Sequence, residues 1–135
     1  MPTVMQEIMQ VPFGAVSINP LARRLIDECL DAKRVTSGRL VREFEDKFAA
    51  LLGVRETVAV SSGTDADTLA LAVLHDLGAR RGDEVIVPAL SFPATAHAVL
   101  HAGFEPVFVD VERDTLNIDP GKIENAVTER TRAIM

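Results

Sequence analysis

The stretch Gly82–Val111, "GDEVIVPALSFPATAHAVLHAGFEPVFVDV", decides the fold because its pattern changes twice within thirty positions. The β-branched run Glu84–Pro88 predicts a buried strand. The apolar segment that follows predicts a helix, capped by Ser91 and stopped by Gly103, and residues 105–111 predict a second strand. A strand, a helix and a strand in succession indicate a parallel pair joined by a right-handed crossover.

The same alternation extends in both directions from this unit. Residues 57–61, "TVAVS", predict an earlier strand, and the helix after it is expected to end near Gly78. Asp119 and Pro120 predict the start of a later helix, and residues 131–135 predict a last strand. The sequence therefore predicts an α/β fold with a mostly parallel sheet and flanking helices.

Two helices are expected before the sheet. Asn19 is a good N-cap, and Gly53 is well placed to end the second helix. Cys29 lies on an apolar helix face and is expected to be a small core residue.

A single domain is predicted over residues 1–135, with an extended segment (1–18), two helices (19–53) and an α/β core (54–135). Because a buried parallel strand normally has neighbours on both sides, we expect this domain to be the front portion of a larger one.

Composition narrows the classes of partner. The chain has 20 acidic and 14 basic side chains, a formal charge of -6 and no basic cluster, which argues against nucleic acid and anionic membranes as partners. No apolar run approaches the ~20 residues that span a bilayer, and no signal peptide is evident. A single cysteine suits a reducing compartment, so a cytoplasmic location is predicted.

The turn "SSGTD", residues 61–65, is the first candidate ligand site, since ligands of open parallel sheets bind beyond the carboxyl ends of the strands. Gly63 would let the backbone approach a ligand, and the hydroxyls of Ser62 and Thr64 could add donors near the helix N-terminus. Asp65 would repel a phosphate unless its carboxylate points away. From these residues alone, a simple helix cap by Ser62 or Thr64 is favoured over a phosphate site.

Two further loops, residues 89–93 and 110–119, qualify by position. Phe92 could stack on a flat ring, although its residue type alone favours core packing. His97 and His101 share a helix face, but the H-E-x-x-H pattern is absent, so a structural or surface role is favoured for both, and for His75 as well.

Several motifs in order carry a resemblance to a known family: "SGRLVREFEDKFAALLGV", "SSGTDADTLALAVL", the stretch from Gly82 to Val111, and "TLNIDPGKIENAVTERTRAIM". From about Val11 to Met135 the chain resembles the DegT/DnrJ/EryC1/StrS family of sugar-nucleotide aminotransferases. The resemblance implies the front portion of the large domain of the aspartate aminotransferase (type I) fold. It also implies pyridoxal 5'-phosphate (PLP) as cofactor.

The resemblance assigns roles only to matching positions. Gly63, Thr64 and Asp65, with the adjacent Ser62, fall where the family binds the PLP phosphate, largely through backbone amides. Phe92 falls where an aromatic side chain stacks on the pyridine ring. Asp67 and Thr68 replace a more apolar pair and depart from the pattern.

The implied reaction is a ping-pong amino transfer from a donor, often glutamate, through pyridoxamine phosphate to a keto-sugar nucleotide. The family's Schiff-base lysine is expected beyond Met135, and Lys33, Lys47 and Lys122 match no such position. No catalytic residue is therefore expected in this chain, and the isolated chain is expected to be inactive. A homodimer is implied, with a contribution from the segments around Phe13 and Gly38.

Two alternatives stay open. One is a PLP-dependent sugar 3-dehydrase of the same family, in which histidine replaces the lysine. The other is a non-catalytic fragment that serves folding or dimerisation. The residue at the lysine position, read from the coding sequence downstream of Met135, would separate these readings.

Overall fold

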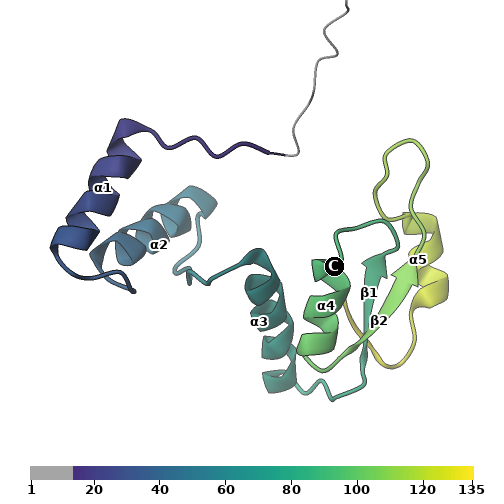
Figure 1. Ribbon diagram of the computed structural model, residues 1–135. Helices are drawn as coiled ribbons and strands as arrows, with labels where there is room; N and C mark the ends of the chain where they lie inside the picture. Colours follow the sequence, from purple (N-terminus) through teal and green to yellow (C-terminus); the bar gives the residue numbers. More distant parts are fainter. Residues whose placement is uncertain (1–13) are drawn as a thin grey trace, which may run out of the picture. The chain divides into compact units, whose positions relative to one another are not determined.

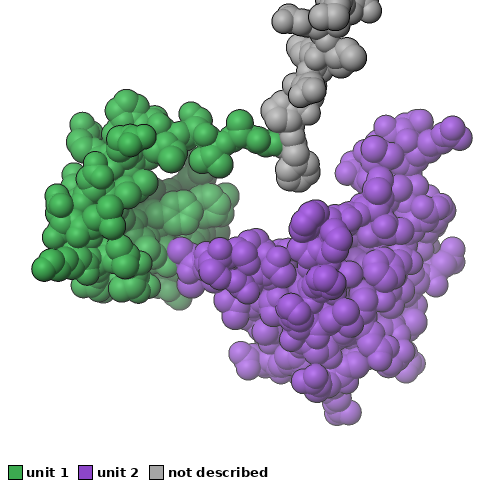
Figure 2. Space-filling model, viewed as in Figure 1, with its two compact units in different colours: residues 1–57 green, residues 58–135 purple. Residues whose placement is uncertain are grey.

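The computed structural model describes residues 14–135, which form two compact units, one up to Thr57 and one from Val58 to Met135 (Figure 2). The single domain predicted over residues 1–135 stays a prediction. Within the described residues the elements are, in chain order, α1 (Pro20–Asp31), α2 (Arg39–Leu52), α3 (Gly63–Asp76), β1 (Glu84–Pro88), α4 (Ala94–His101), β2 (Glu105–Val109), α5 (Pro120–Ala126) and β3 (Thr131–Ile134) (Figure 1). None of these helices is long and apolar enough to cross a membrane.

In the first unit, the first helix begins and the second helix ends where the sequence predicts. The Asn19 side chain accepts a hydrogen bond from the backbone N–H of Ala22 (2.8 Å) at the start of α1. α2 ends at Gly53, whose φ of 67° lies in the left-handed region that glycine enters without a Cβ clash.

The apolar faces of α1 and α2 are largely exposed, so the core position predicted for Cys29 is wrong. Cys29 is only half-buried, and Ala49 is the sole buried residue in the two helices. Phe44 and Phe48 stack on each other with ring centroids 5.6 Å apart, yet both rings stay exposed to solvent. Helical spacing creates an apolar face, but a second layer of structure is needed to bury it.

The second unit is built on a parallel sheet in the order β2-β1-β3, which confirms the predicted fold class. β1 occupies the centre. Glu84 lies opposite Glu105 of β2, and Ile86 lies opposite Ile134 of β3. Each connection between strands contains a helix, as parallel pairing requires.

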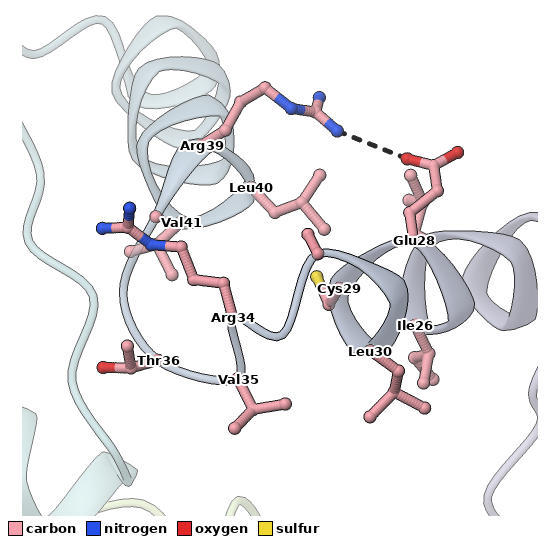
Figure 3. Close-up of a pocket in the computed structure, with 13 residues that line it drawn as sticks. Ile26, Glu28, Cys29, Leu30, Arg34, Val35, Thr36, Arg39, Leu40 and Val41 are labelled. Carbon is pink, nitrogen blue, oxygen red and sulfur yellow. Dashed lines mark hydrogen bonds and ion pairs between the residues drawn. The ribbon is translucent and has the colours of Figure 1, made fainter.

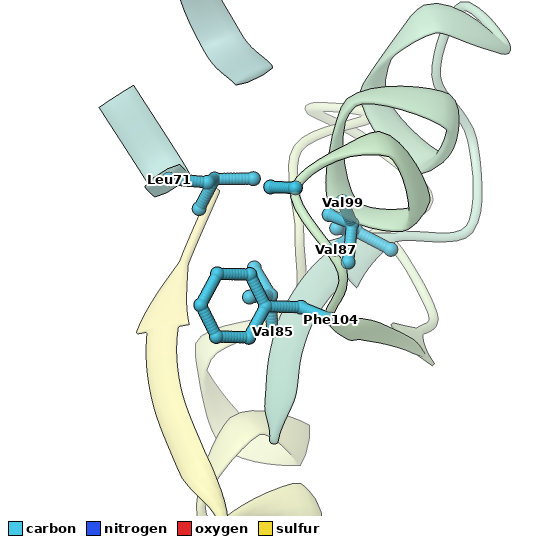
Figure 4. Packing of buried hydrophobic residues seen from close by; sticks show 6 residues of the cluster. Leu71, Val85, Val87, Val99 and Phe104 are labelled. Atoms are coloured by element: carbon cyan, nitrogen blue, oxygen red, sulfur yellow. The ribbon is translucent and has the colours of Figure 1, made fainter. Parts of the chain in front are cut away.

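The core forms where α3 and α4 cover one face of β1. Val85 and Val87 are fully buried and pack with Leu71 of α3, Val99 of α4 and Phe104 just before β2 (Figure 4). Ile86, between the two valines, points to the opposite face and is also fully buried. β1 is therefore apolar on both faces, as its continuous β-branched run predicts.

Two buried carboxylates at the start of β1 bind the last strand. Asp83 accepts hydrogen bonds from the backbone N–H of Arg80 (2.9 Å) and from Nε of Arg132 (2.6 Å), and these contacts lower the pKa of its carboxyl group. Glu84 is ion-paired with Arg130. Both carboxylates are 6% exposed, so each depends on its partners for compensation of its buried charge.

The strand predicted at residues 57–61 is absent, and this prediction is wrong. The segment is irregular, and Val58 is 78% exposed. A strand exists only through hydrogen bonds to a neighbouring strand. The sheet of the described residues contains β2, β1 and β3, and none of them pairs with this segment. Its β-branched composition alone does not provide that neighbour.

Substitution of Ile86 by alanine should destabilise the second unit by about 2–5 kcal/mol, because it leaves a cavity in the centre of the sheet. The matched control is Ile134→Ala in the paired register position of β3, where the side chain is 54% exposed and the loss should be much smaller. Urea unfolding of both variants measures the two losses, and equal losses would contradict the central position of β1.

Candidate functional site

The two sequence-predicted ligand segments lie at the N-terminal ends of neighbouring helices. α3 and α4 pack side by side (Figure 1). Near their C-terminal ends, Nε2 of His75 lies 2.8 Å from the carbonyl oxygen of Ala102. The helices therefore run in the same direction. This places the turn before α3 and the loop before α4 at the same end of the pair, where β1 also ends.

Ser62 is the N-cap of α3, which confirms one of the two cap residues considered. Its hydroxyl oxygen accepts a hydrogen bond from the N–H of Asp65 (3.1 Å), and its carbonyl accepts one from the N–H of Ala66 (3.1 Å). Thr64 lies inside the first turn instead, and its carbonyl accepts from the Thr68 hydroxyl (2.8 Å). The cap satisfies the third and fourth N–H groups of the helix.

The Asp65 carboxylate is held by the two serines before the helix. The hydroxyls of Ser61 and Ser62 both donate to Oδ2 of Asp65, the latter at 2.9 Å. The Ser61 hydrogen bond and then that of Ser62 lower the pKa of the Asp65 carboxyl group. The Ser62 hydroxyl therefore both accepts from the Asp65 N–H and donates to the Asp65 carboxylate, which fixes the first turn of α3.

The first two N–H groups of α3 have no hydrogen-bond partner among the described residues. No hydrogen bond within residues 14–135 uses the N–H of Gly63 or of Thr64, because the Ser62 cap binds the next two. A Cβ built on Gly63 would meet no atom within 4 Å. Free N–H groups at the positive end of a helix dipole, with room beside them, suit an anion such as phosphate.

Phe92 is 75% exposed, so the core packing that its residue type favours is wrong. The predicted Ser91 cap is also wrong. The N-cap of α4 is Pro93, which has no side-chain acceptor, and Ser91 instead hydrogen-bonds the Thr95 hydroxyl (2.8 Å). The Phe92 carbonyl accepts from the Thr95 N–H (3.1 Å), which fixes the backbone while the ring stays free to contact a ligand.

The third candidate loop, residues 110–119, folds back through an antiparallel bridge between Val111 and Ile118. At its base, Nζ of Lys122 lies 2.9 Å from Asp110 and 3.5 Å from Asp119. The hydrogen bond to Asp110 raises the pKa of Lys122. The lysine is thereby held as an ammonium ion, which is not nucleophilic.

The histidines have structural surroundings. His97 and His101 lie with ring centroids 6.3 Å apart on α4, and residues 14–135 contain no cluster of three His, Cys, Asp or Glu side chains that could hold a metal. His75 stacks on Phe104 (centroids 4.6 Å apart) and contacts two backbone carbonyls. The position of His75 in the last turn of α3 is the sequence feature that could have indicated this contact between the two helices.

The first unit contains a separate concavity of about 440 Å³ between α1 and α2 (Figure 3). Its walls are mostly apolar and include Cys29 and Leu40. On its rim, Arg39 pairs with Glu28 (3.4 Å). The arginine is also paired with Glu43, so its charge is already compensated within α1 and α2.

Comparison with known proteins identifies the family. Residues 17–135 match the DegT/DnrJ/EryC1/StrS aminotransferase family. The chain belongs to this family.

Relatives from this family align with nearly the whole chain. The spore coat polysaccharide biosynthesis protein SpsC of Bacillus subtilis is 44% identical over 93% of the chain and 31% of its own length. The 3-oxo-glucose-6-phosphate:glutamate aminotransferase of the same organism is 40% identical over 96% of the chain and 30% of its own length. The chain thus spans about a third of the length of these DegT/DnrJ/EryC1/StrS relatives.

A solved structure shares the fold. The Escherichia coli GDP-4-keto-6-deoxy-D-mannose-3-dehydratase with bound hydrated PLP superposes with a TM-score of 0.82 at 36% identity, over 93% of this chain and 33% of the dehydratase. The predicted resemblance to PLP-dependent sugar-modifying enzymes of the DegT/DnrJ/EryC1/StrS family is confirmed.

Substitution of Ser62 by alanine in this family member should destabilise the second unit by about 1 kcal/mol, because the N–H of Asp65 loses its capping acceptor. Ser61→Ala is the matched control, since it removes a hydrogen bond to the same carboxylate but no backbone cap. Denaturation midpoints of the two variants provide the comparison. A Ser61→Ala loss as large as that of Ser62→Ala would argue against the cap.

Proposed function

We propose that this chain supplies the phosphate-binding turn and the ring-stacking residue of a PLP-dependent sugar aminotransferase. One observation carries the proposal: the N–H groups of Gly63 and Thr64 are free at the start of α3, beside open space. Family membership supports it independently, because the matched region includes this turn.

The phosphate would be held by the backbone of the first turn of α3. Gly63 and Thr64 would donate their N–H groups, and the Thr64 hydroxyl is a further donor nearby. Ser62 and Asp65 would act through the backbone, since their hydrogen bonds to each other fix the turn in which those N–H groups stay open. The Asp65 carboxylate already accepts hydrogen bonds from two hydroxyls, which offsets part of its repulsion toward an anion.

Phe92 would cover one face of the cofactor ring. Its ring is exposed, and its backbone is anchored to the first turn of α4 through the carbonyl hydrogen bond to Thr95. An aromatic side chain fixed in this way offers a flat apolar surface to a heteroaromatic ring. When bound, PLP supplies the electron sink for amino transfer.

The 135 residues would bind the cofactor without turning it over. The chain has three lysines. Lys33 and Lys47 belong to the first unit, and Lys122 is held as an ammonium ion by two carboxylates. Lys122 is therefore not suited to bind the cofactor covalently and move a proton at its reactive carbon, and the family resemblance assigns none of the three lysines to the Schiff-base position.

The proposed substrate of the whole protein is a keto-sugar nucleotide, and the proposed amino donor is glutamate. A structural relative acts on a GDP-linked keto-sugar, and a sequence relative is a glutamate-dependent aminotransferase for a sugar phosphate. We also propose a homodimer in the cytoplasm. Of the two segments assigned to the dimer contact, Gly38 precedes α2, and Phe13 lies outside the described residues.

A second function within the family is a PLP-dependent 3-dehydration of the sugar. It is favoured by the superposition on the E. coli dehydratase, which carries PLP. The two reactions differ in the residue at the Schiff-base position, lysine or histidine, which the downstream coding sequence would reveal. A third alternative, a non-catalytic folding or dimerisation fragment, predicts a chain that dimerises but does not bind the cofactor.

Substitution of Gly63 by alanine should weaken binding of pyridoxamine 5'-phosphate by about tenfold or more without unfolding the chain. The new methyl group meets no protein atom, but it enters the space beside the free N–H groups. Calorimetric titration with pyridoxamine 5'-phosphate, and with pyridoxamine as the ligand that lacks the phosphate, measures the effect.

Gly14→Ala is the control for this substitution, because Gly14 also has open space around it and lies in the other unit. It should leave binding unchanged. Equal affinity of wild type and Gly63→Ala, or equal affinity for the two ligands, would contradict the phosphate site.

The isolated chain, supplied with PLP, L-glutamate and a keto-sugar nucleotide, should form no 2-oxoglutarate, because none of its three lysines matches the family's Schiff-base position and Lys122 is held as an ammonium ion. A coupled glutamate dehydrogenase assay measures the product. The full-length 3-oxo-glucose-6-phosphate:glutamate aminotransferase of Bacillus subtilis, assayed in parallel with its own sugar phosphate, would control for the reagents. Steady 2-oxoglutarate formation by the 135 residues would contradict this assignment.

A further inference from the structure

His75 joins the C-terminal ends of α3 and α4. Its Nδ1 lies 3.0 Å from the carbonyl oxygen of Ala79, and its Nε2 lies 2.8 Å from that of Ala102, the C-cap of α4. The ring stacks on Phe104 with an interplanar angle of 9°. A single half-buried side chain thus contacts the connection after α3, the end of α4 and the residue that precedes β2.

The two carbonyls require a protonated ring. A carbonyl oxygen only accepts hydrogen bonds, whereas a neutral imidazole carries one donor and one acceptor nitrogen. Only the imidazolium ion donates to both oxygens at once. The C-terminal ends of α3 and α4 also favour a cation there, because their free carbonyls carry partial negative charge.

The charged groups near the ring act in opposite directions. The hydrogen bonds to Ala102 and then to Ala79 raise the pKa of His75, Asp76 adds to this, and burial and Arg81 lower it. The Arg81 side chain lies against Gly103. Of the other titratable groups on the adjoining elements, His101 at the end of α4 acts on Asp65, and Glu105 is paired with Arg130 (3.8 Å).

We propose that His75, as an imidazolium ion, is a positioning residue that clamps α3 to α4 and thereby sets the spacing between the Gly63–Thr64 turn and Phe92. The clamp lies at the opposite end of the helices from both segments, so it contacts no cofactor. It works because the two helices run side by side as rigid rods that begin at the two ligand segments. This inference rests on the function proposed above for those segments.

The pH dependence follows from the direction of the pKa shift. The folded-state pKa of His75 is raised above the value of about 6.5 for an unfolded chain. Its contribution to stability is therefore complete below the unfolded pKa and is lost as the pH rises through the folded pKa. The spacing of the two ligand segments should loosen over the same range.

The test uses the full chain, with His75→Phe as the variant and His97→Gln as the matched control. Phenylalanine keeps a ring over Phe104 but donates no hydrogen bond, and His97 is an exposed histidine of the same helix pair. NMR titration follows the histidine rings and the backbone N–H signals of Gly63, Thr64 and Phe92. Calorimetry with pyridoxamine 5'-phosphate is performed at about pH 6 and about pH 8.5, on either side of the imidazole range.

We expect His75 to titrate at a higher pH in the folded chain than in the urea-unfolded chain, with both ring nitrogens protonated below its pKa. The three N–H signals should shift with the His75 pKa in wild type and in His97→Gln, but not in His75→Phe. Between the two pH values, wild type should lose affinity for pyridoxamine 5'-phosphate by about two- to tenfold more than His75→Phe, the equivalent of one hydrogen bond. Ionisation of the ligand phosphate is common to all three proteins and cancels in this comparison.

The proposal is overturned if His75 titrates in the folded chain at or below its value in the unfolded chain, or if the N–H signals of wild type and His75→Phe share one pH profile. Absence of pyridoxamine 5'-phosphate binding in every protein would instead overturn the proposed function. In that case the ring titration and the N–H signals, which need no ligand, still decide whether His75 clamps the helices.

Discussion

Burial of β1 on both faces is the constraint on which the rest of the second unit depends. A strand with Val85 and Val87 on one face and Ile86 on the other needs helices or loops over both faces. Because its neighbouring strands are parallel to it, each connection must run from the end of one strand back to the end of the sheet where the next strand begins. The helices that follow the strands must begin where the strands end. The loop before α4 lies at that edge because α4 follows β1, and the turn before α3 lies there because α3 packs beside α4 and runs in the same direction.

Features set by local chemistry could be predicted from the sequence, whereas features that depend on a partner could not. The bounds of β1 and the caps at Asn19 and Asp119 follow from side chains that act within a few residues. The segment 57–61 has the same β-branched character as β1 but lacks a pairing strand. The exposure of Cys29 and Phe92 likewise depends on whether residues distant in sequence pack against them, and the local sequence pattern does not contain this information.

In the turn of residues 61–65, a helix cap and a phosphate site are compatible with each other. The residue types alone present these two functions as alternatives, because both would involve Ser62 and its neighbours. In the structure they use different groups: the cap binds the N–H groups of Asp65 and Ala66, and those of Gly63 and Thr64 stay open. The cap is thus compatible with the proposed phosphate site. Residue types alone do not reveal this division, since it depends on the direction of individual N–H bonds.

The buried carboxylates at the start of β1 also bear on how the chain assembles during synthesis. β2 and α4 follow β1 closely in sequence, so this part can form as soon as residues 84–109 have emerged. The partner of Glu84 lies just before the last strand and that of Asp83 lies on it, 46 and 49 positions further along the chain. Until Arg130 and Arg132 have been synthesised, one edge of β1 has no partner strand, and the carboxylates of Asp83 and Glu84 have no ion-pair partners there. The incomplete sheet then has an unpaired strand edge, which can pair with strands of other chains. Asp83 and Glu84 place negative charge at this edge, and the resulting repulsion disfavours such pairing.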